Sequence, residues 1–168
     1  MSIYKSNKQI ISWIKGDGMW NNNKIKNLKY LEKKWGCELI GKDTKMWSSV
    51  LGEQIVRIFL EEKGLKVWRP KIKNGLHPDW ETEKYIYEVK TRNWNTPGTA
   101  GEKILGVPFK YSKVPILYKK PLRIILVAFQ EKEGEKFELF EPKCINKIKM
   151  LRMWSKMNIT FKKCSDLI

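Results

Sequence analysis

The run Pro121 to Phe129 constrains the fold of this chain more than any other segment, because its residues are almost all apolar and several are β-branched. A run of this length and composition is typical of a central strand that is buried on both faces. A strand of that kind needs helices packed on each side of its sheet. We therefore predict an α/β fold with a mixed central sheet flanked by helices.

Helical and alternating patterns predict the elements around this strand. A helix is expected from Val50 to about Lys63, with a cap at Ser48 or Ser49 and an end at Gly64. Period-two alternation and helical spacing predict the others. They are strands at Leu65 to Lys71, His77 to Glu81, Tyr85 to Thr91, Phe137 to Phe140 and Asn158 to Lys162, a helical stretch from Thr99 interrupted by Gly106 and Pro108, and a helix from Ile145 to Met157. The order corresponds to an αβββαβ core with additions.

The first part of the chain differs from the rest. Residues 1–46 are rich in Lys and Asn and carry two short helical patterns, Gln9 to Ile14 and Ile25 to Trp35. We interpret 1–46 as a basic helical N-terminal extension whose apolar face docks on the body, and 47–168 as the core. A length of 168 residues fits a single domain overall.

The charge is strongly positive. The chain has 34 basic and 18 acidic residues, a formal charge of +16, which favours a polyanionic partner such as nucleic acid. Only five of the basic residues are Arg, and Asn and Ile are also plentiful. An AT-rich coding genome would produce the same bias, so the charge alone does not establish nucleic-acid binding.

Cysteine usage and the N-terminus indicate a compartment. The three cysteines have no C-x-x-C spacing and His77 cannot complete a zinc site with them, so they are interpreted as structural thiols in a reducing environment. No leader-like segment and no long apolar run is present in the sequence. We expect a soluble intracellular, cytoplasmic protein with no membrane partner, located in the host cell if it is viral.

A group of charged residues carries the chemistry. If the segments bearing Asp79 and Glu88 form an antiparallel hairpin centred between Glu83 and Lys84, Asp79 lies opposite Glu88 with Cβ atoms about 5 Å apart. Lys90 then projects from the same face as Glu88, roughly 7 Å along the strand. Two converging carboxylates suit magnesium, and an ammonium beside a metal-bound water suits phosphodiester hydrolysis. The carbonyl of Val89 would be a further metal ligand.

Alternating charges on a strand usually form a solvated face, so the Glu-Val-Lys triplet by itself is weak evidence for a catalytic site. Two further features strengthen it: Pro78-Asp79 stands nine residues upstream, and Glu53 lies on a capped helix before that. This combination is uncommon by chance.

Glu53, Pro78-Asp79 and Glu88-Val89-Lys90 resemble the motif of the PD-(D/E)xK nuclease superfamily, over the range Ser49 to Gln130. The blocks Glu88 to Trp94 and Thr99 to Tyr111 are also similar to restriction-endonuclease-like proteins of large DNA viruses. The resemblance implies a restriction-endonuclease-like core and a Mg²⁺ site, with Mn²⁺ able to substitute. It further implies that Asp79 and Glu88 bind the metal, Lys90 assists the attacking water, and Glu53 supports the metal directly or through water.

Residues after the Glu88 strand are candidates for DNA contact. We expect Arg92, Lys103 and Lys110 to hold phosphates, with ordinary surface solvation as the alternative for the lysines. Asn93 or Trp94 would meet bases, because Trp94 lies in a polar segment, and Gln130 would make a polar contact at the end of its strand. The Gly98 to Glu102 segment lacks P-loop spacing, so no nucleotide cofactor is expected.

The sequence therefore predicts a magnesium-dependent DNA endonuclease. A type II restriction-like homodimer is the main hypothesis, since two-fold symmetry reads a palindromic site. A Holliday-junction resolvase or repair nuclease, cutting branched or damaged DNA, would share the same residues. A non-catalytic basic nucleic-acid-binding module is the alternative from another class.

Overall fold

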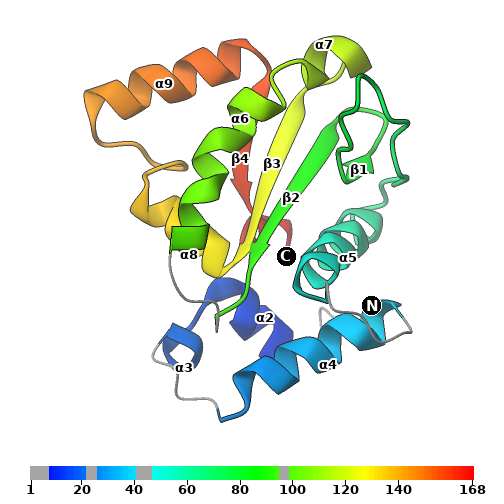
Figure 1. The fold of residues 1–168 in the computed structure, drawn as a ribbon, viewed down its shortest axis with the longest axis vertical. Helices are drawn as coiled ribbons and strands as arrows, with labels where there is room; N and C mark the ends of the chain where they lie inside the picture. The colour runs from blue at the N-terminus through cyan, green and yellow to red at the C-terminus, as the bar shows by residue number, and fades with distance from the viewer. Residues whose placement is uncertain (1–7, 22–25, 41–46, 95–98) are drawn as a thin grey trace.

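The computed structural model describes residues 8–21, 26–40, 47–94 and 99–168, which build one open sheet with helices on both faces (Figure 1). The sheet has four strands in the order β1 (Trp80–Glu81), β2 (Ile86–Arg92), β3 (Leu122–Ala128) and β4 (Ile159–Lys163). β1 pairs with β2 antiparallel, whereas β2, β3 and β4 are parallel to one another. The predicted α/β class with a mixed, helix-flanked sheet is confirmed.

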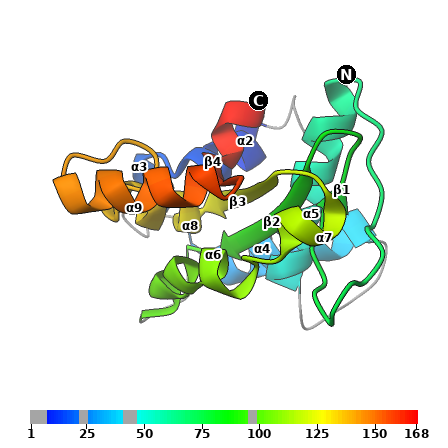
Figure 2. The ribbon, with the colours of Figure 1, turned by 90° about the horizontal axis from the view of Figure 1, so that it is seen from above.

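The helices divide by the face of the sheet that they cover. One face carries the N-terminal helices α2 (Lys8–Lys15), α3 (Gly18–Asn21), α4 (Leu28–Ile40) and α5 (Trp47–Glu62). The other carries the crossover from β2 to β3, which consists of the 3₁₀ helix η1 (Thr99–Gly106), α6 (Val107–Lys110) and α7 (Val114–Tyr118). We call these the α5 face and the α6 face; Figure 2 shows the strands as a layer between α6 and α2.

Two further helices connect β3 to β4, and the chain ends in a short turn. α8 (Phe129–Lys136) follows β3 directly, and α9 (Ile145–Lys156) precedes β4. The 3₁₀ helix η2 (Cys164–Leu167) follows β4. None of the described helices combines the length and the apolar character that a membrane crossing needs.

The apolar run at β3 is the centre of the molecule, as its sequence predicts. Because side chains alternate along a strand, Ile125 and Val127 pack on the α5 face while Ile124 and Leu126 pack on the α6 face. All four are essentially inaccessible to solvent. Their burial divides the core into two clusters, one on each face of the sheet.

The described part of the N-terminal segment belongs to this core. Trp13, Trp20 and Trp35 are buried in the cluster on the α5 face, and their rings meet edge-on or tilted at centroid distances of 5.8 and 6.4 Å. The carboxylate of Glu32, also buried, accepts hydrogen bonds from the indole N–H of Trp13 at 2.8 Å and the backbone N–H of Trp94 at 2.9 Å. These bonds join α2 and α4 to the end of β2.

Several predicted elements are shorter than expected or absent. The expected strand at Leu65 to Lys71 is reduced to one bridge, in which Trp68 and Glu81 exchange backbone hydrogen bonds of 3.0 and 2.8 Å. The expected strand at His77 to Glu81 survives only as Trp80–Glu81. Pro70 and Pro78 lack the N–H that a ladder requires, and in the antiparallel register both lie on the same side of the bridge, where they limit further pairing.

Two other differences have local causes. Phe137 to Phe140 forms no strand, because α8 runs on to Lys136 and Glu138 then takes a left-handed backbone conformation with φ of 59°. The α5 helix starts at Trp47, before the predicted caps; the side chain of Ser48 lies outside the described part of the chain, and Ser49 lies within the first turn. The predicted β2, β3, β4 and α9 are confirmed within one residue at each end.

Candidate active site

The hairpin formed by β1 and β2 brings Asp79 next to Glu88. The strands pair Trp80 with Tyr87 and Glu81 with Ile86, which is the register that the spacing of the sequence predicts. Just before β1, the backbone N–H of Asp79 donates to the carbonyl of Tyr87 at 2.9 Å, one position off this register. The regular ladder therefore ends at Trp80, and this bond holds Asp79 beside β2.

A side-chain bond fixes the Asp79 carboxylate against β2. The backbone N–H of Val89 donates to its Oδ2 at 2.7 Å. Because the N–H and the carbonyl of one strand residue point to the same side, the Val89 carbonyl also faces Asp79. The carboxylate and the carbonyl named as candidate ligands therefore lie on one edge of β2.

Glu53 approaches the pair from α5, because that helix packs unusually close to β2. A Cβ built on Gly52 would overlap the side chain of Thr91, so only glycine permits this approach. The indole N–H of Trp80 donates to the backbone carbonyl of Glu53 at 2.8 Å and fixes the helix against β1. Helix, edge strand and β2 thus converge on one site.

The charges of Glu88 and Glu53 both act on the Asp79 carboxylate. The pKa of Asp79 is raised to about 8, chiefly by burial and then by the neighbouring charges of Glu88 and Glu53, against the opposing effect of the Val89 N–H. Burial also raises the pKa of Glu88, while Lys90 and Tyr111 act to lower it. Acids held together in this way favour the binding of a cation.

Arg69, which the sequence analysis did not single out, lies among these acids. Its guanidinium is 2.5 Å from Glu53 Oε2 and 3.6 Å from Asp79 Oδ1, and it donates to the Asp79 carbonyl at 3.0 Å. It also stacks over the ring of Trp80 at 3.9 Å. The sequence offered one signal for a role of Arg69, which is that arginine is rare in this Lys-rich chain. A planar, forked cation cannot be replaced by lysine, so a rare arginine marks a position where that shape is needed.

Lys90 and Tyr111 face the Glu88 carboxylate on the α6 face. Lys90 Nζ lies 2.5 Å from Glu88 Oε1, and hydrogen bonding from the Tyr111 side chain is among the causes that lower the Glu88 pKa. Glu88 Oε2 is buried and has no hydrogen bond of ordinary geometry within the described residues. Tyr111 comes from the turn after α6, and no pattern in the sequence assigned it a role.

These residues fit magnesium better than a metal that needs a full set of protein ligands. No cluster of three or more His, Cys, Asp or Glu side chains with metal-binding geometry occurs in 8–21, 26–40, 47–94 and 99–168. Magnesium usually keeps several waters and takes one or two carboxylates. Asp79, Glu88 and the Val89 carbonyl would supply such a set, and Glu88 Oε2 is buried without a hydrogen bond of ordinary geometry within the described residues.

A hollow of about 640 Å³ opens beside Lys90 on the α6 face. Its walls include Lys90, Tyr111 and five of the residues predicted to contact DNA, which are Arg92, Asn93, Lys103, Lys110 and Gln130. Of these five, Lys103 and Lys110 are exposed. Both lysines that were predicted to bind phosphate are therefore accessible to a phosphate group.

Burial corrects the prediction for the others. Trp94 is in the core, where its indole N–H donates to the Trp13 carbonyl at 2.9 Å and its ring packs on Phe129, so the prediction that it meets a base is wrong. The amide of Gln130, also buried, donates to the Gly101 carbonyl at 2.9 Å. The residues next to Trp94 in the sequence are polar and gave no sign that Trp94 is buried. The residues that bury it come from α2 and α8, which are distant in the sequence.

Arg92 and Asn93 are likewise buried, and each interacts within the protein. The Arg92 guanidinium lies 4.3 Å from the centre of the Phe129 ring and 3.8 Å from Glu133 Oε1. We therefore interpret both as supports for the end of β2, and not as the phosphate or base contacts that the sequence suggested.

Comparison of the chain with protein-family models, with curated proteins and with solved structures finds no match.

Proposed function

We propose that this protein is a magnesium-dependent DNA endonuclease of the PD-(D/E)xK type. The observation that carries the proposal is the β1–β2 hairpin, which holds the Asp79 carboxylate against β2 next to Glu88, with Lys90 paired to Glu88. Glu53 from α5 completes the pattern of the motif. On this proposal α5, the bridge at Trp68, β1, β2, the helical crossover and β3 correspond to the αβββαβ core of such enzymes, and α8, α9 and β4 are additions.

The residues have separate roles in the proposed reaction. Asp79, Glu88 and the Val89 carbonyl would hold Mg²⁺, which when bound neutralises charge that develops on the phosphate and lowers the pKa of a coordinated water. Lys90 orients the attacking water and stabilises negative charge near it. Tyr111 holds the Glu88 carboxylate by hydrogen bonding, so that Glu88 and Lys90 keep their relative positions.

Substrate binding is assigned to the hollow beside Lys90. Lys103 and Lys110 line it and are exposed, so their ammonium groups can contact the phosphates that flank the cleaved bond. A double-stranded DNA substrate with a palindromic site, read by a homodimer, is the form of the proposal that we favour. A junction resolvase or repair nuclease would use the same residues on branched or damaged DNA.

Cleavage of supercoiled plasmid tests the proposal. The purified chain is incubated with plasmid and Mg²⁺, with Mn²⁺ in place of Mg²⁺, or with EDTA, and the ends of any products are sequenced. We expect metal-dependent cutting that Asp79→Asn and Glu88→Gln each abolish while DNA binding is kept, because the losses fall on metal binding. Discrete ends would indicate a restriction-like enzyme, and cutting of four-way junctions alone would indicate a resolvase.

The same experiment can overturn the proposal. Plasmid and junctions that both stay intact with either metal, or full activity in both variants, would contradict it. Binding of DNA without any cleavage would favour the non-catalytic module.

A further inference from the structure

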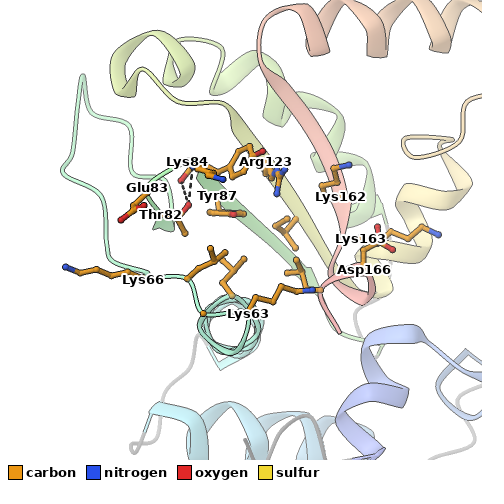
Figure 3. Close-up of a pocket in the computed structure, with 16 residues that line it drawn as sticks. Lys63, Lys66, Thr82, Glu83, Lys84, Tyr87, Arg123, Lys162, Lys163 and Asp166 are labelled. Carbon is orange, nitrogen blue, oxygen red and sulfur yellow. Dashed lines mark hydrogen bonds between the residues drawn. The ribbon is translucent and has the colours of Figure 1, made fainter. Parts of the chain in front are cut away.

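A second pocket lies behind the strand that carries the candidate active site. It has a volume of about 480 Å³ and is lined by residues from the end of α5, the β1–β2 turn, β2, β3, β4 and η2 (Figure 3). Tyr87 and Arg123 line it from adjacent, paired strands. Because side chains alternate along β2, Tyr87 points to the face opposite Glu88 and Lys90. The pocket is therefore separate from the metal site and the hollow beside it.

The pocket is rimmed mainly by cations. Its basic residues are Lys63, Lys66, Lys84, Arg123, Lys162 and Lys163, against two acids, Glu83 and Asp166. Lys163 is paired with Glu135 at 2.8 Å, and Figure 3 shows the Lys66 side chain extending away from the space. Lys63, Lys84 and Lys162 make no ion pair within the described residues. Arg123, Lys63, Lys84 and Lys162 therefore remain as cations for a bound anion.

Arg123 is the best placed of these. Its guanidinium stacks on the Tyr85 ring at 3.4 Å from the ring centre, which holds the plane of the fork in one orientation. A fixed guanidinium binds the oxygens of a phosphate in pairs, with less loss of side-chain freedom than a lysine. The pocket thus has an oriented phosphate-binding group and is not lined by surface lysines alone.

The pocket also has a surface for a ligand that is not purely ionic. Leu60, Leu65, Ile125 and Leu167 form apolar parts of its wall, beside the buried ring of Tyr87. Its volume lies in the range of small-molecule sites, about 300–1,000 Å³. Its chemistry suits a flat, partly apolar group joined to an anion.

We propose that this pocket binds a phosphorylated nucleotide, with the phosphate on Arg123 and the base against the apolar wall. Within the described residues, this pocket has no glycine-rich loop of the kind that binds phosphate in a P-loop. Nucleotide binding in it does not require the proposed nuclease activity. A free mononucleotide and the 5′-phosphorylated end of a DNA strand present the same group, so both are possible sources of the ligand.

Titration of the full chain with deoxyadenosine 5′-monophosphate tests the proposal, by calorimetry or by NMR, in the presence of EDTA. Deoxyadenosine and inorganic phosphate are titrated in parallel. We expect the nucleotide to bind at least about tenfold more tightly than either part, because the pocket contacts both. Phosphate that binds as tightly as the nucleotide would overturn the proposal, as would the absence of binding.

Two arginine variants separate this pocket from the general positive charge. Arg123→Leu is expected to weaken nucleotide binding at least about tenfold, since it removes a charge-assisted, paired contact. Arg152→Leu on α9 removes the same charge outside the pocket and is expected to change nothing. Equal losses in both variants would overturn the proposal. If thermal unfolding shows that Arg123→Leu is misfolded, the exposed Lys162→Ala replaces it, and undiminished binding in that variant counts against the site.

Oligonucleotides then distinguish the two sources. A single strand with a 5′-phosphate is used to displace the mononucleotide, and the same strand with a 5′-hydroxyl is the control. Displacement by the phosphorylated strand alone identifies a strand end as the ligand, and no displacement identifies the free nucleotide. Asp79→Asn is expected to keep nucleotide binding, so a failure of the proposed nuclease and a failure of this site give different results.

Discussion

Arg69 holds the Glu53 carboxylate at 2.5 Å while its guanidinium also lies 3.6 Å from Asp79. One side-chain cation thus contacts two of the three acids that the motif assigns to the metal site. On the proposed function, a metal ion at Asp79 would share this negative charge with Arg69 or displace it. Arg69 would then raise the concentration of metal that the proposed site requires.

We predict that Arg69→Ala binds Mg²⁺ or Mn²⁺ more tightly, by about tenfold, because a competing cation has been removed from the carboxylates. Metal binding is measured directly, by Mn²⁺ electron paramagnetic resonance on the DNA-free protein. Arg57→Ala is the matched control, since Arg57 also lies over the Trp80 ring, at 5.7 Å, but pairs with Glu61. Weaker metal binding in Arg69→Ala would show instead that Arg69 positions the ligands.

Lys90 is expected to affect both activity and stability. Its role beside the attacking water predicts that Lys90→Ala lowers single-turnover cleavage by about 10²–10⁴-fold, and that Lys90→Arg restores it only in part. An exposed strand lysine would have little effect on stability, but Lys90 is half-buried and pairs with the buried Glu88. Its loss should therefore cost about 1–3 kcal/mol, the cost of an uncompensated buried group.

A double variant separates these two effects. Glu88→Gln combined with Lys90→Ala removes the charge left behind, so unfolding stability should recover toward the wild type while cleavage stays absent. Lys34→Ala, in the exposed pair with Glu38, is the control and should change stability by less than about 0.5 kcal/mol. Additive losses of stability in the double variant would mean that Lys90 and Glu88 do not act as a pair.

DNA binding should depend on the lysines of the hollow beside Lys90. We predict that Lys110→Ala weakens binding of DNA at every sequence and reduces the slope of log affinity against log salt by about 1. The control is Lys149→Ala on α9, which removes the same charge outside the hollow. Equal changes in both variants, measured by fluorescence anisotropy at several salt concentrations, would mean that DNA is held by net charge alone.

The parts of the fold that were predictable are those set by local pattern. The burial of β3 follows from its composition, and the register of the β1–β2 hairpin follows from counting across a short turn, because register is determined by the length of the loop. Trp68 illustrates the opposite case. Polar and apolar residues alternate in its segment as they do in a strand. The segment nevertheless forms a single bridge, because prolines lie nearby and the segment is at the edge of the sheet.

The parts of the site that were missed depend on residues far apart in the chain. Arg69 reaches Glu53 across sixteen positions, and Trp94 is buried by Trp13, which is 81 positions away. No local pattern encodes such contacts. The same applies to Glu32, whose burial follows from the docking of α2 and α4 on the end of β2.

Glu32 provides a test of that docking. We predict that Glu32→Ala lowers the free energy of unfolding by about 2–4 kcal/mol, because the N–H groups of Trp13 and Trp94 lose a buried acceptor. Glu32→Gln keeps a carbonyl oxygen in place and should cost less. Glu38→Gln on the same helix, where the side chain is exposed, is the control. Unchanged urea unfolding in Glu32→Ala would show that residues 8–40 are a separable extension.

The last prediction concerns pH. The pKa of Asp79 is raised from 3.8 to about 8 in the folded protein, chiefly by burial and then by Glu88 and Glu53. The folded state therefore binds a proton that the unfolded state has lost between about pH 4 and pH 8, and stability of the metal-free protein falls as pH rises through this window. For one group the slope is at most about 1.4 kcal/mol per pH unit.

Asp79→Asn removes this titration and isolates its contribution from those of Glu32, Glu88 and Glu131, whose pKa values are also raised by burial. Urea unfolding in EDTA at pH 5 and at pH 8 is compared for the two proteins. We expect the wild type to lose more stability than the variant over this interval, and Mg²⁺ to restore the wild type at pH 8, because the metal takes the place of the proton. Equal losses in the two proteins would mean that Asp79 is ionised throughout, and the close approach of the three carboxylates would then be wrong.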